Sequence, residues 1–272
     1  MQNGVKIVVK RLKYLSISEP EFKHQMEFVG NVRHENVAAL RACYSSANER
    51  LMLYDYYDKG SVFALLHGKR GTRKTRLSWE TRLRIGVGAA RGIAHIHQQD
   101  GGKLVHGDIK PSNIFLNGKN YSLVSDVGLP KLMNPIRRYL SLGYRAPEVK
   151  DSTEVSQASG VYSFGVVLLE LVPGKPPQFT MIHGEVVLLV NWIHILSRDY
   201  GTRSVIDEEL MYDRTGELIH NGLVRHQNDL RPMVRLLQIA VECVTVLPER
   251  RPRMLEVGGN QWHRTIGCIK RG

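Results

Sequence analysis

Hydrophobic and polar positions in the first sixty residues predict two strands and one helix. Residues 5–12 are β-branched and apolar with interspersed lysines, which indicates a strand. Ser18 is a candidate N-cap for the helix that follows. Apolar positions of that helix recur at helical spacing: Phe22, Met26 and Val29. Residues 51–54 form a short apolar run that predicts a second strand, so we expect a small α+β unit here.

The pattern becomes mainly helical after residue 60. Ser78 is a candidate cap for a long helix with one apolar stripe, formed by Leu83, Val87, Ala90 and Ala94. Residues 161–172 are apolar on nearly all sides, as in a helix buried within a large domain. A later stripe stops before Pro248 and consists of Met233, Leu236, Ala240 and Val244.

A hairpin between the first two of these helices carries the candidate chemistry. Residues 114–116 and 121–124 predict two strands joined by an Asn-Gly turn. Because such strands are antiparallel, the residues flanking the hairpin must lie side by side. We therefore expect Asn113 and Asp126 to lie together, with Asp108 and Lys110 close by.

These four residue types suit phosphoryl transfer. Two hard oxygen ligands, from Asn113 and Asp126, match the preference of Mg²⁺ for one or two protein oxygens plus phosphates. A carboxylate such as Asp108 can accept a proton from a hydroxyl group. A lysine such as Lys110 can neutralise the transferred phosphoryl group, and catalysis of this kind rests on positioning and charge stabilisation.

The same residues resemble the motif set of protein kinases. Residues 108–113 match the catalytic loop, residues 126–128 (Asp-Val-Gly) the metal-binding triplet, and residues 146–148 (Ala-Pro-Glu) the end of the activation segment. Lys10 resembles the lysine that contacts ATP phosphates. Further segments are similar to plant leucine-rich-repeat receptor-like kinases, in the subgroup often called probable inactive receptor kinases: residues 68–70, 88–97, 113–116, 143–148, 161–165 and 251–254.

The resemblance, which covers roughly residues 4–256, implies an α+β, bilobal protein-kinase-like fold. Residues 1–57 would be a partial, β-rich N-lobe with the lysine strand, a helix and the hinge. Residues 58–256 would be a mainly helical C-lobe, and residues 257–272 a divergent basic tail. Because only nine residues precede Lys10, the glycine-rich loop over the ATP phosphates is absent, and the domain is expected to be N-terminally truncated.

The resemblance also assigns roles to individual residues, with ATP and Mg²⁺ as weakly bound cofactors. Asp108 would be the catalytic base, and Lys110 would steady the transferred phosphate. Metal ligands would be Asn113 and Asp126. The remaining nucleotide contacts would come from Lys10, from Tyr54 as gatekeeper, and from the hinge residues Asp55 and Tyr57.

One further residue and one residue pair also receive roles from the resemblance. Ser141 would occupy the position that favours Ser/Thr substrates. Glu148 would pair with Arg251 to hold the large lobe together.

Several positions depart from the pattern of an active kinase. The helix glutamate that pairs with the ATP lysine is replaced by Gln25, and Glu27 faces another direction because residues two apart on a helix do not share a face. Gly107 replaces the arginine of the catalytic loop. Val127 replaces a phenylalanine. Gly160 stands where the family has an aspartate that anchors this loop, so Asp108 is expected to be held less firmly.

Charge and composition narrow the partners. The net charge is +12, but the basic residues are scattered or lie in loops without a groove-reading motif, so we expect protein partners or a protein substrate and no nucleic acid. Three cysteines without metal-ligand spacing indicate reduced thiols and a cytoplasmic location. No apolar run is long enough for a membrane span, so membrane association is expected only if the chain belongs to a longer receptor.

Three hypotheses follow. The favoured one is a signalling pseudokinase, or a strongly impaired Ser/Thr kinase, with residual ATP and Mg²⁺ binding. The alternative is an active Ser/Thr protein kinase that transfers the γ-phosphoryl group of ATP to protein hydroxyls. The third, which is compatible with both, is that the chain is an incomplete product of a longer receptor gene.

Overall fold

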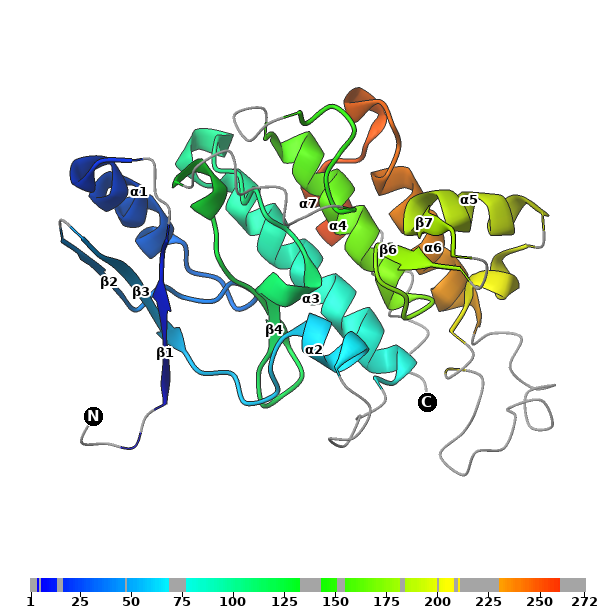
Figure 1. Ribbon diagram of the computed structural model, residues 1–272, viewed down its shortest axis with the longest axis horizontal. Helices are drawn as coiled ribbons and strands as arrows, with labels where there is room; N and C mark the ends of the chain where they lie inside the picture. Colours follow the sequence, from blue (N-terminus) through cyan, green and yellow to red (C-terminus); the bar gives the residue numbers. More distant parts are fainter. Residues whose placement is uncertain are drawn as a thin grey trace.

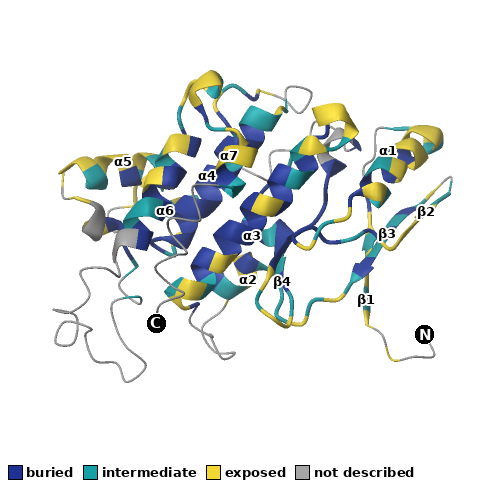
Figure 2. Ribbon diagram, turned by 180° about the vertical axis from the view of Figure 1, so that it is seen from behind, coloured by how far each residue is buried: buried dark blue, intermediate teal, exposed yellow. Residues whose placement is uncertain are grey.

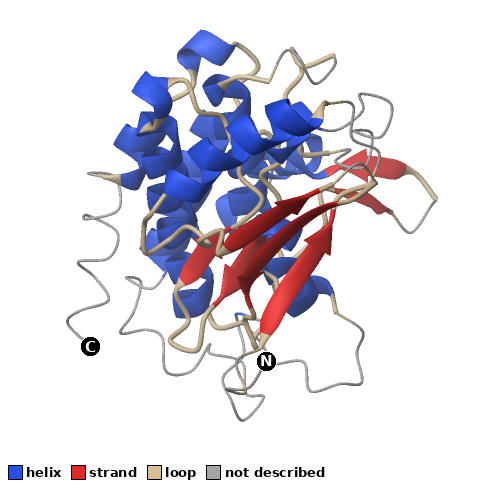
Figure 3. Ribbon diagram, turned by 90° about the vertical axis from the view of Figure 1, so that its left-hand side faces the viewer, coloured by secondary structure: helices blue, strands red, loops and turns tan. Residues whose placement is uncertain are grey.

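The computed structural model describes residues 4, 6–13, 17–46, 48–68, 77–132, 143–150, 155–181, 184–199, 201–207, 210 and 230–259. Figure 1 shows a small sheet with one helix at one end and a larger helical part at the other. Figure 3 shows the strands of this sheet on one side of the molecule and the helices behind them. This arrangement confirms the predicted bilobal α+β fold.

The small sheet has three antiparallel strands in the order β1-β3-β2. They are β1 (Ile7–Arg11), β2 (Ala42–Ser45) and β3 (Arg50–Asp55). Among the described residues β1 pairs only with β3, and Val8 and Val9 on it are 41% and 52% exposed. Within the described residues, the lysine strand is thus an open edge of the sheet. Strand β2 was not predicted, because three of its four residues are exposed and show no apolar alternation.

Helix α1 (Glu19–Asn31) covers the sheet and begins with the predicted cap. The Ser18 hydroxyl accepts the Glu21 N–H at 3.4 Å, and the Glu21 carboxylate accepts the Ser18 N–H at 2.8 Å. This reciprocal capping box satisfies two backbone donors that a helix otherwise leaves unpaired. The predicted apolar positions are all buried: Phe22, Met26 and Val29.

The helical part contains α2 (Val62–His67), α3 (Trp79–Gln98), α4 (Gln157–Leu171), α5 (Leu189–Asp199), α6 (Leu230–Cys243) and α7 (Met254–Gly258). Ser78 caps α3 by accepting the Thr81 N–H at 3.3 Å, as predicted. Helix α4 packs against α6, and α3 packs against α7. Figure 2 shows α3 and α4 as mostly buried, with more exposed positions on α1 and α5.

Two β-hairpins interrupt the helices. The predicted one pairs β4 (Ile114–Leu116) with β5 (Ser122–Val124), in a register that places Ile114 opposite Val124. The loop after α1 is hydrogen-bonded to this hairpin. Val124 N–H donates to Asn36 O and Ala38 N–H donates to Val124 O, both at 2.9 Å. A second hairpin, β6 (Gln178–Thr180) with β7 (Val186–Leu188), was not predicted from the sequence.

The described part of the chain contains no helix both long and apolar enough to cross a membrane.

Candidate functional site

The hairpin brings the predicted site residues together from two chain segments. Asn113 ends the turn before β4, and Ser125 follows β5 on the other side. Ser125 N–H donates to Asn113 O at 2.9 Å. The two chain segments that flank the hairpin are therefore hydrogen-bonded to each other directly beside the predicted site residues. Asp126 follows directly and is 6% exposed. Antiparallel pairing therefore places Asn113 beside the Asp126 segment, as the sequence predicted.

Asp108 is held by Asn113 and Lys110. The Asn113 Nδ2 donates to both the backbone oxygen and the Oδ2 of Asp108, at 2.8 and 3.0 Å. Lys110 Nζ lies 2.7 Å from the same Oδ2. Both side chains of this ion pair are about a quarter exposed, 21% for Lys110 and 26% for Asp108. The carboxylate is thus fixed in position but remains within reach of a ligand.

The buried side chain of His106 forms hydrogen bonds with both segments of the site. His106 Nε2–H donates to Ser125 O at 2.7 Å, and its Nδ1 accepts the Asp108 N–H at 3.2 Å. Complete burial lowers the pKa of His106, and this effect outweighs the nearby carboxylates, which act to raise it. The imidazole is therefore neutral. One of its ring nitrogens hydrogen-bonds the segment before the hairpin, and the other hydrogen-bonds the segment after it.

Asp126 sits on a strained backbone. Its φ is +65°, in the left-handed region that side chains other than glycine rarely adopt. Gly107 and Gly128 nearby have φ of +85° and +71°. Strained residues of this kind cluster at functional sites, where the surrounding structure holds them in place. An arginine at position 107, as in the family pattern, would be strained in this conformation, so the glycine suits the backbone found here.

Lys10 forms its ion pair with Asp126. Its Nζ contacts Asp126 Oδ2, with the lysine side chain 40% exposed and the aspartate 8% exposed. No glutamate of α1 takes part in this pair: Glu27 is 75% exposed and faces His24 instead. Gln25, at the position expected for the glutamate, points toward the triplet, since a Cβ on Gly128 would lie 2.8 Å from its Nε2. The lysine is thus bound to the residue expected to hold metal.

The predicted hinge residues lie at the end of β3, apart from the Asp108 cluster. Tyr54 is 6% exposed, and burial, with a smaller contribution from the Asp126 charge, raises its pKa. The Asp55 carboxylate accepts two hydrogen bonds from Arg41 Nε, at 3.0 and 3.1 Å. Tyr57 is half-buried and its ring lies 6.0 Å from that of Phe115. This packing and pairing leave the backbone of residues 55–57 as the part suited to contact an adenine.

At Gly160, helix α4 lacks the side chain that the family uses to anchor the catalytic loop. Gly160 has no side chain, and an added Cβ would lie 3.6 Å from His97 Nε2, which is buried and has no hydrogen-bond partner. Burial lowers the pKa of His97 to about 4. Gln157 holds the neighbouring loop instead, donating to the backbone oxygens of Gly102 and His97 at 2.9 Å.

The predicted structural pair is present. Arg251 donates to both carboxylate oxygens of Glu148, at 2.6 and 2.8 Å, and its side chain is buried. It also donates to the backbone oxygens of Ala158 and Thr245, so it ties three segments together. Ser141, the predicted substrate-loop hydroxyl, lies outside the described residues.

Sequence reasoning missed a buried polar cluster in the same lobe. Glu170 on α4 is fully buried and accepts a hydrogen bond from Tyr144 Oη at 2.6 Å, with His67 Nε2 against its other oxygen. Burial raises the pKa of Glu170 against the opposing effect of these partners. The available signal was one acidic residue inside the apolar run 161–172, because a charge in such a run is buried only with partners.

The donor set fits a hard cation. The amide nitrogen of Asn113 is directed at Asp108, which leaves Asn113 Oδ1 without a hydrogen bond from the described residues. Asp126 supplies a carboxylate at the other end of the hairpin. Two such oxygens are what Mg²⁺ takes from a protein when phosphates complete its shell.

Comparisons with known proteins agree with this geometry. A "Probable inactive receptor kinase" of Arabidopsis thaliana is 46% identical over 259 residues, which is 94% of this chain and 39% of that protein. An Arabidopsis thaliana "Inactive leucine-rich repeat receptor-like serine/threonine-protein kinase" is 40% identical over 94% of this chain and 40% of that protein. The chain therefore spans about two-fifths of the length of these relatives.

Two solved structures share the fold. The pseudokinase domain of BIR2, an immune regulator of the RLK/Pelle family, matches with a TM-score of 0.75 and 27% identity over 99% of this chain and 76% of that one. The kinase domain of maize sucrose-induced receptor kinase 1 bound to AMP-PNP matches with a TM-score of 0.80 and 27% identity over 99% and 87%. The family model described as the protein kinase domain matches residues 1–262, and the chain belongs to the protein kinase family.

Proposed function

We propose that this chain is a pseudokinase-like signalling domain that retains weak ATP and Mg²⁺ binding and acts mainly by docking other proteins. The observation that carries the proposal is the pairing of Lys10 with Asp126 in place of an acidic residue from α1. In an active kinase the lysine pairs with a helix glutamate and the aspartate holds the metal. Here the two residues neutralise each other, so a nucleotide must displace this pair before metal and phosphate can bind.

The residues present still fit the cofactors. Asn113 and Asp126 would hold Mg²⁺, and Lys10 would contact the ATP phosphates after release from Asp126. Tyr54, Asp55 and Tyr57 would lie along the adenine. When bound, the metal would supply positive charge that neutralises the ATP phosphates.

Residual binding can be tested with a thermal melt in ATP, with and without Mg²⁺. A ligand at about a hundred times its dissociation constant adds roughly 2.7 kcal/mol, or several degrees in Tm for a domain of this size. We expect a Mg²⁺-dependent increase in wild type that disappears in Asp126→Asn. Asp199→Asn is the matched control, because Asp199 pairs with Arg198 at the end of α5 and not with the site. An unchanged Tm in wild type at millimolar ATP would contradict residual binding.

A second candidate function is an active Ser/Thr kinase, and one observation favours it. Asp108, Lys110 and Asn113 form a connected cluster with hydrogen-bond and ion-pair distances of 2.7–3.0 Å. Phosphoryl transfer by the purified protein should then be lost in Asp108→Asn, because the base would be gone. Turnover of about 1 s⁻¹ or more that vanishes in this variant would overturn the pseudokinase proposal. Equal signal in both proteins identifies a contaminating kinase.

The lobes, partners and location complete the proposal. Residues 1–57 would act as the N-lobe, residues 58–256 as the C-lobe and docking surface, and residues 257–272 as a basic tail. The partners would be signalling proteins, with the domain on the cytoplasmic side. The names of the relatives support a place for this domain in a longer receptor, as do the shares of their length that it covers.

A further inference from the structure

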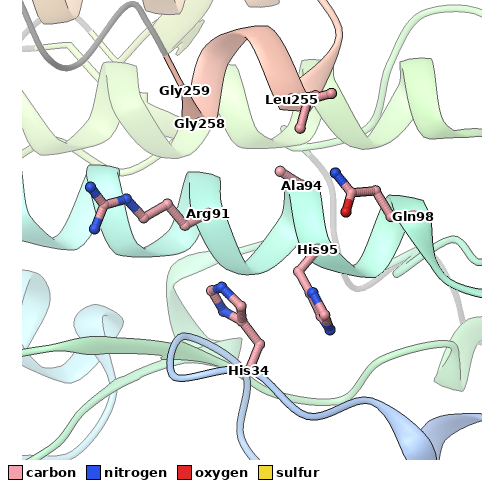
Figure 4. Close-up of a pocket in the computed structure, with 8 residues that line it drawn as sticks. All are labelled: His34, Arg91, Ala94, His95, Gln98, Leu255, Gly258 and Gly259. Carbon is pink, nitrogen blue, oxygen red and sulfur yellow. The ribbon is translucent and has the colours of Figure 1, made fainter.

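A basic pocket lies away from the nucleotide site, between α3, α7 and the loop after α1 (Figure 4). Its volume is about 220 Å³. His34 comes from the loop, and Arg91 and His95, one helical turn apart, come from α3. Leu255 and Gly258 of α7 form the opposite rim. None of the described residues that line it is acidic, so the pocket gathers one guanidinium and two imidazoles without a carboxylate among them.

The two imidazoles are stacked and each has a defined donor. Their ring centroids are 4.7 Å apart with an interplanar angle of 23°. His34 Nδ1 accepts the Asn36 N–H at 3.0 Å, which leaves Nε2 to carry the proton. His95 Nε2 lies 3.3 Å from the Gln99 amide nitrogen and accepts from it, which leaves Nδ1 as the donor. Figure 4 shows both rings on the same side of α3.

No acidic side chain lines the pocket, although Glu35 lies beside His34. Arg91 is exposed and forms no ion pair with any described residue. Burial lowers the pKa of His34, and His95 and Arg91 lower it further, while Glu35 beside it acts in the opposite direction. Protonating His34 beside His95 and Arg91 therefore costs free energy, and a bound anion would offset that cost.

We propose that this pocket binds a phosphate monoester or another small dianion, held by Arg91, His34 and His95. A dianion offsets three clustered cationic groups better than a single carboxylate does, and the pocket is smaller than those that hold drug-sized ligands. None of the lining residues belongs to the predicted nucleotide site. The pocket is connected to the hairpin, because the His34 loop continues into Asn36, whose backbone oxygen accepts the Val124 N–H.

Calorimetric titration with sulfate tests the proposal, because sulfate remains a dianion across the pH range used. We expect tighter binding at about pH 6 than at about pH 8, because a bound dianion favours the protonated form of His34. Arg91→Gln should weaken binding by about tenfold at both pH values. Arg198→Gln, which removes one exposed charge on α5, is the matched control and should leave affinity unchanged.

Two further arms locate the site and identify the source of the anion. The imidazole ¹⁵N signals of His34 and His95 should shift on titration in wild type and in Lys10→Gln, which impairs the nucleotide site. Inorganic phosphate and O-phosphoserine are then titrated separately. Tighter binding of inorganic phosphate indicates free phosphate as the ligand, and tighter binding of O-phosphoserine indicates a phosphorylated protein side chain. Sulfate binding that Lys10→Gln abolishes and Arg91→Gln leaves intact would overturn the proposal, as would the absence of binding at about pH 6.

Discussion

Replacing Gly160 by alanine is expected to stabilise the protein, whereas the same change at Gly165 on the same helix is expected to destabilise it. Alanine in a helix is favoured over glycine by about 0.5–1 kcal/mol, because glycine loses more backbone freedom on folding. The difference between the two positions lies in what an added methyl group would contact, and both contacts are set by the packing of α4.

At Gly160 the methyl group would meet ordinary contacts. Its nearest neighbours would be Ile109 Cδ1 at 3.5 Å and His97 Nε2 at 3.6 Å. The helix gain should therefore be retained in full, so Gly160→Ala is expected to raise the free energy of unfolding by about 0.5–1 kcal/mol.

At Gly165 the same methyl group would lie inside the contact with α6. It would be 2.6 Å from Cys243 Cβ, 2.8 Å from Val244 Cγ1 and 3.1 Å from the backbone oxygen of Ala240. Overpacking of this kind costs about 1–3 kcal/mol, because the two helices must move apart. After subtraction of the helix gain, Gly165→Ala should lower the free energy of unfolding by about 1–2 kcal/mol.

Urea denaturation of the three proteins measures both changes from the shift in midpoint at constant slope. A thermal melt should show Tm changes of opposite sign, about 2–4 °C for each kcal/mol. Equal shifts in the same direction would refute the reasoning, because they would show that helix propensity alone determines the outcome and that the contact with α6 does not.

Two more predictions concern the effect of buried ionisable groups on stability. Because the native pKa of His97 is about 4, the unfolded chain binds a proton that the folded one does not as pH falls below 6.5, so stability is lost between these values and not above them. The free energy of unfolding lost through this group reaches about 3 kcal/mol near pH 4. His97→Gln should therefore reduce the acid-induced loss of unfolding free energy, measured by urea denaturation, by that amount. An unchanged pH profile would contradict this. Glu148→Ala leaves the guanidinium of Arg251 buried without its carboxylate and should cost about 3 kcal/mol, whereas Glu80→Ala, which removes an exposed pair, should cost less than about 1 kcal/mol. Similar midpoints for these last two variants would show that the buried pair contributes no more than a surface pair.

Local patterns predicted the elements that have strong local signals. The N-cap at Ser18, the cap at Ser78 and the Asn-Gly hairpin were all confirmed, because each depends on hydrogen bonds within a few residues. Strand β2 and the β6–β7 hairpin were missed. Their residues are largely exposed, so the pairing partner stabilises the strand and the apolar alternation that would reveal it is absent.

The sequence by itself determined the family and the fold class, because motif spacing along the chain is a one-dimensional property, and it predicted which residues form the candidate site. It also identified the loss of the helix glutamate at Gln25. Only the tertiary structure decided that Lys10 pairs with Asp126, since 116 positions separate them and the choice of partner depends on how α1 packs against the hairpin. The same holds for the His34–His95 pocket, whose two rings meet only when the loop after α1 packs against α3.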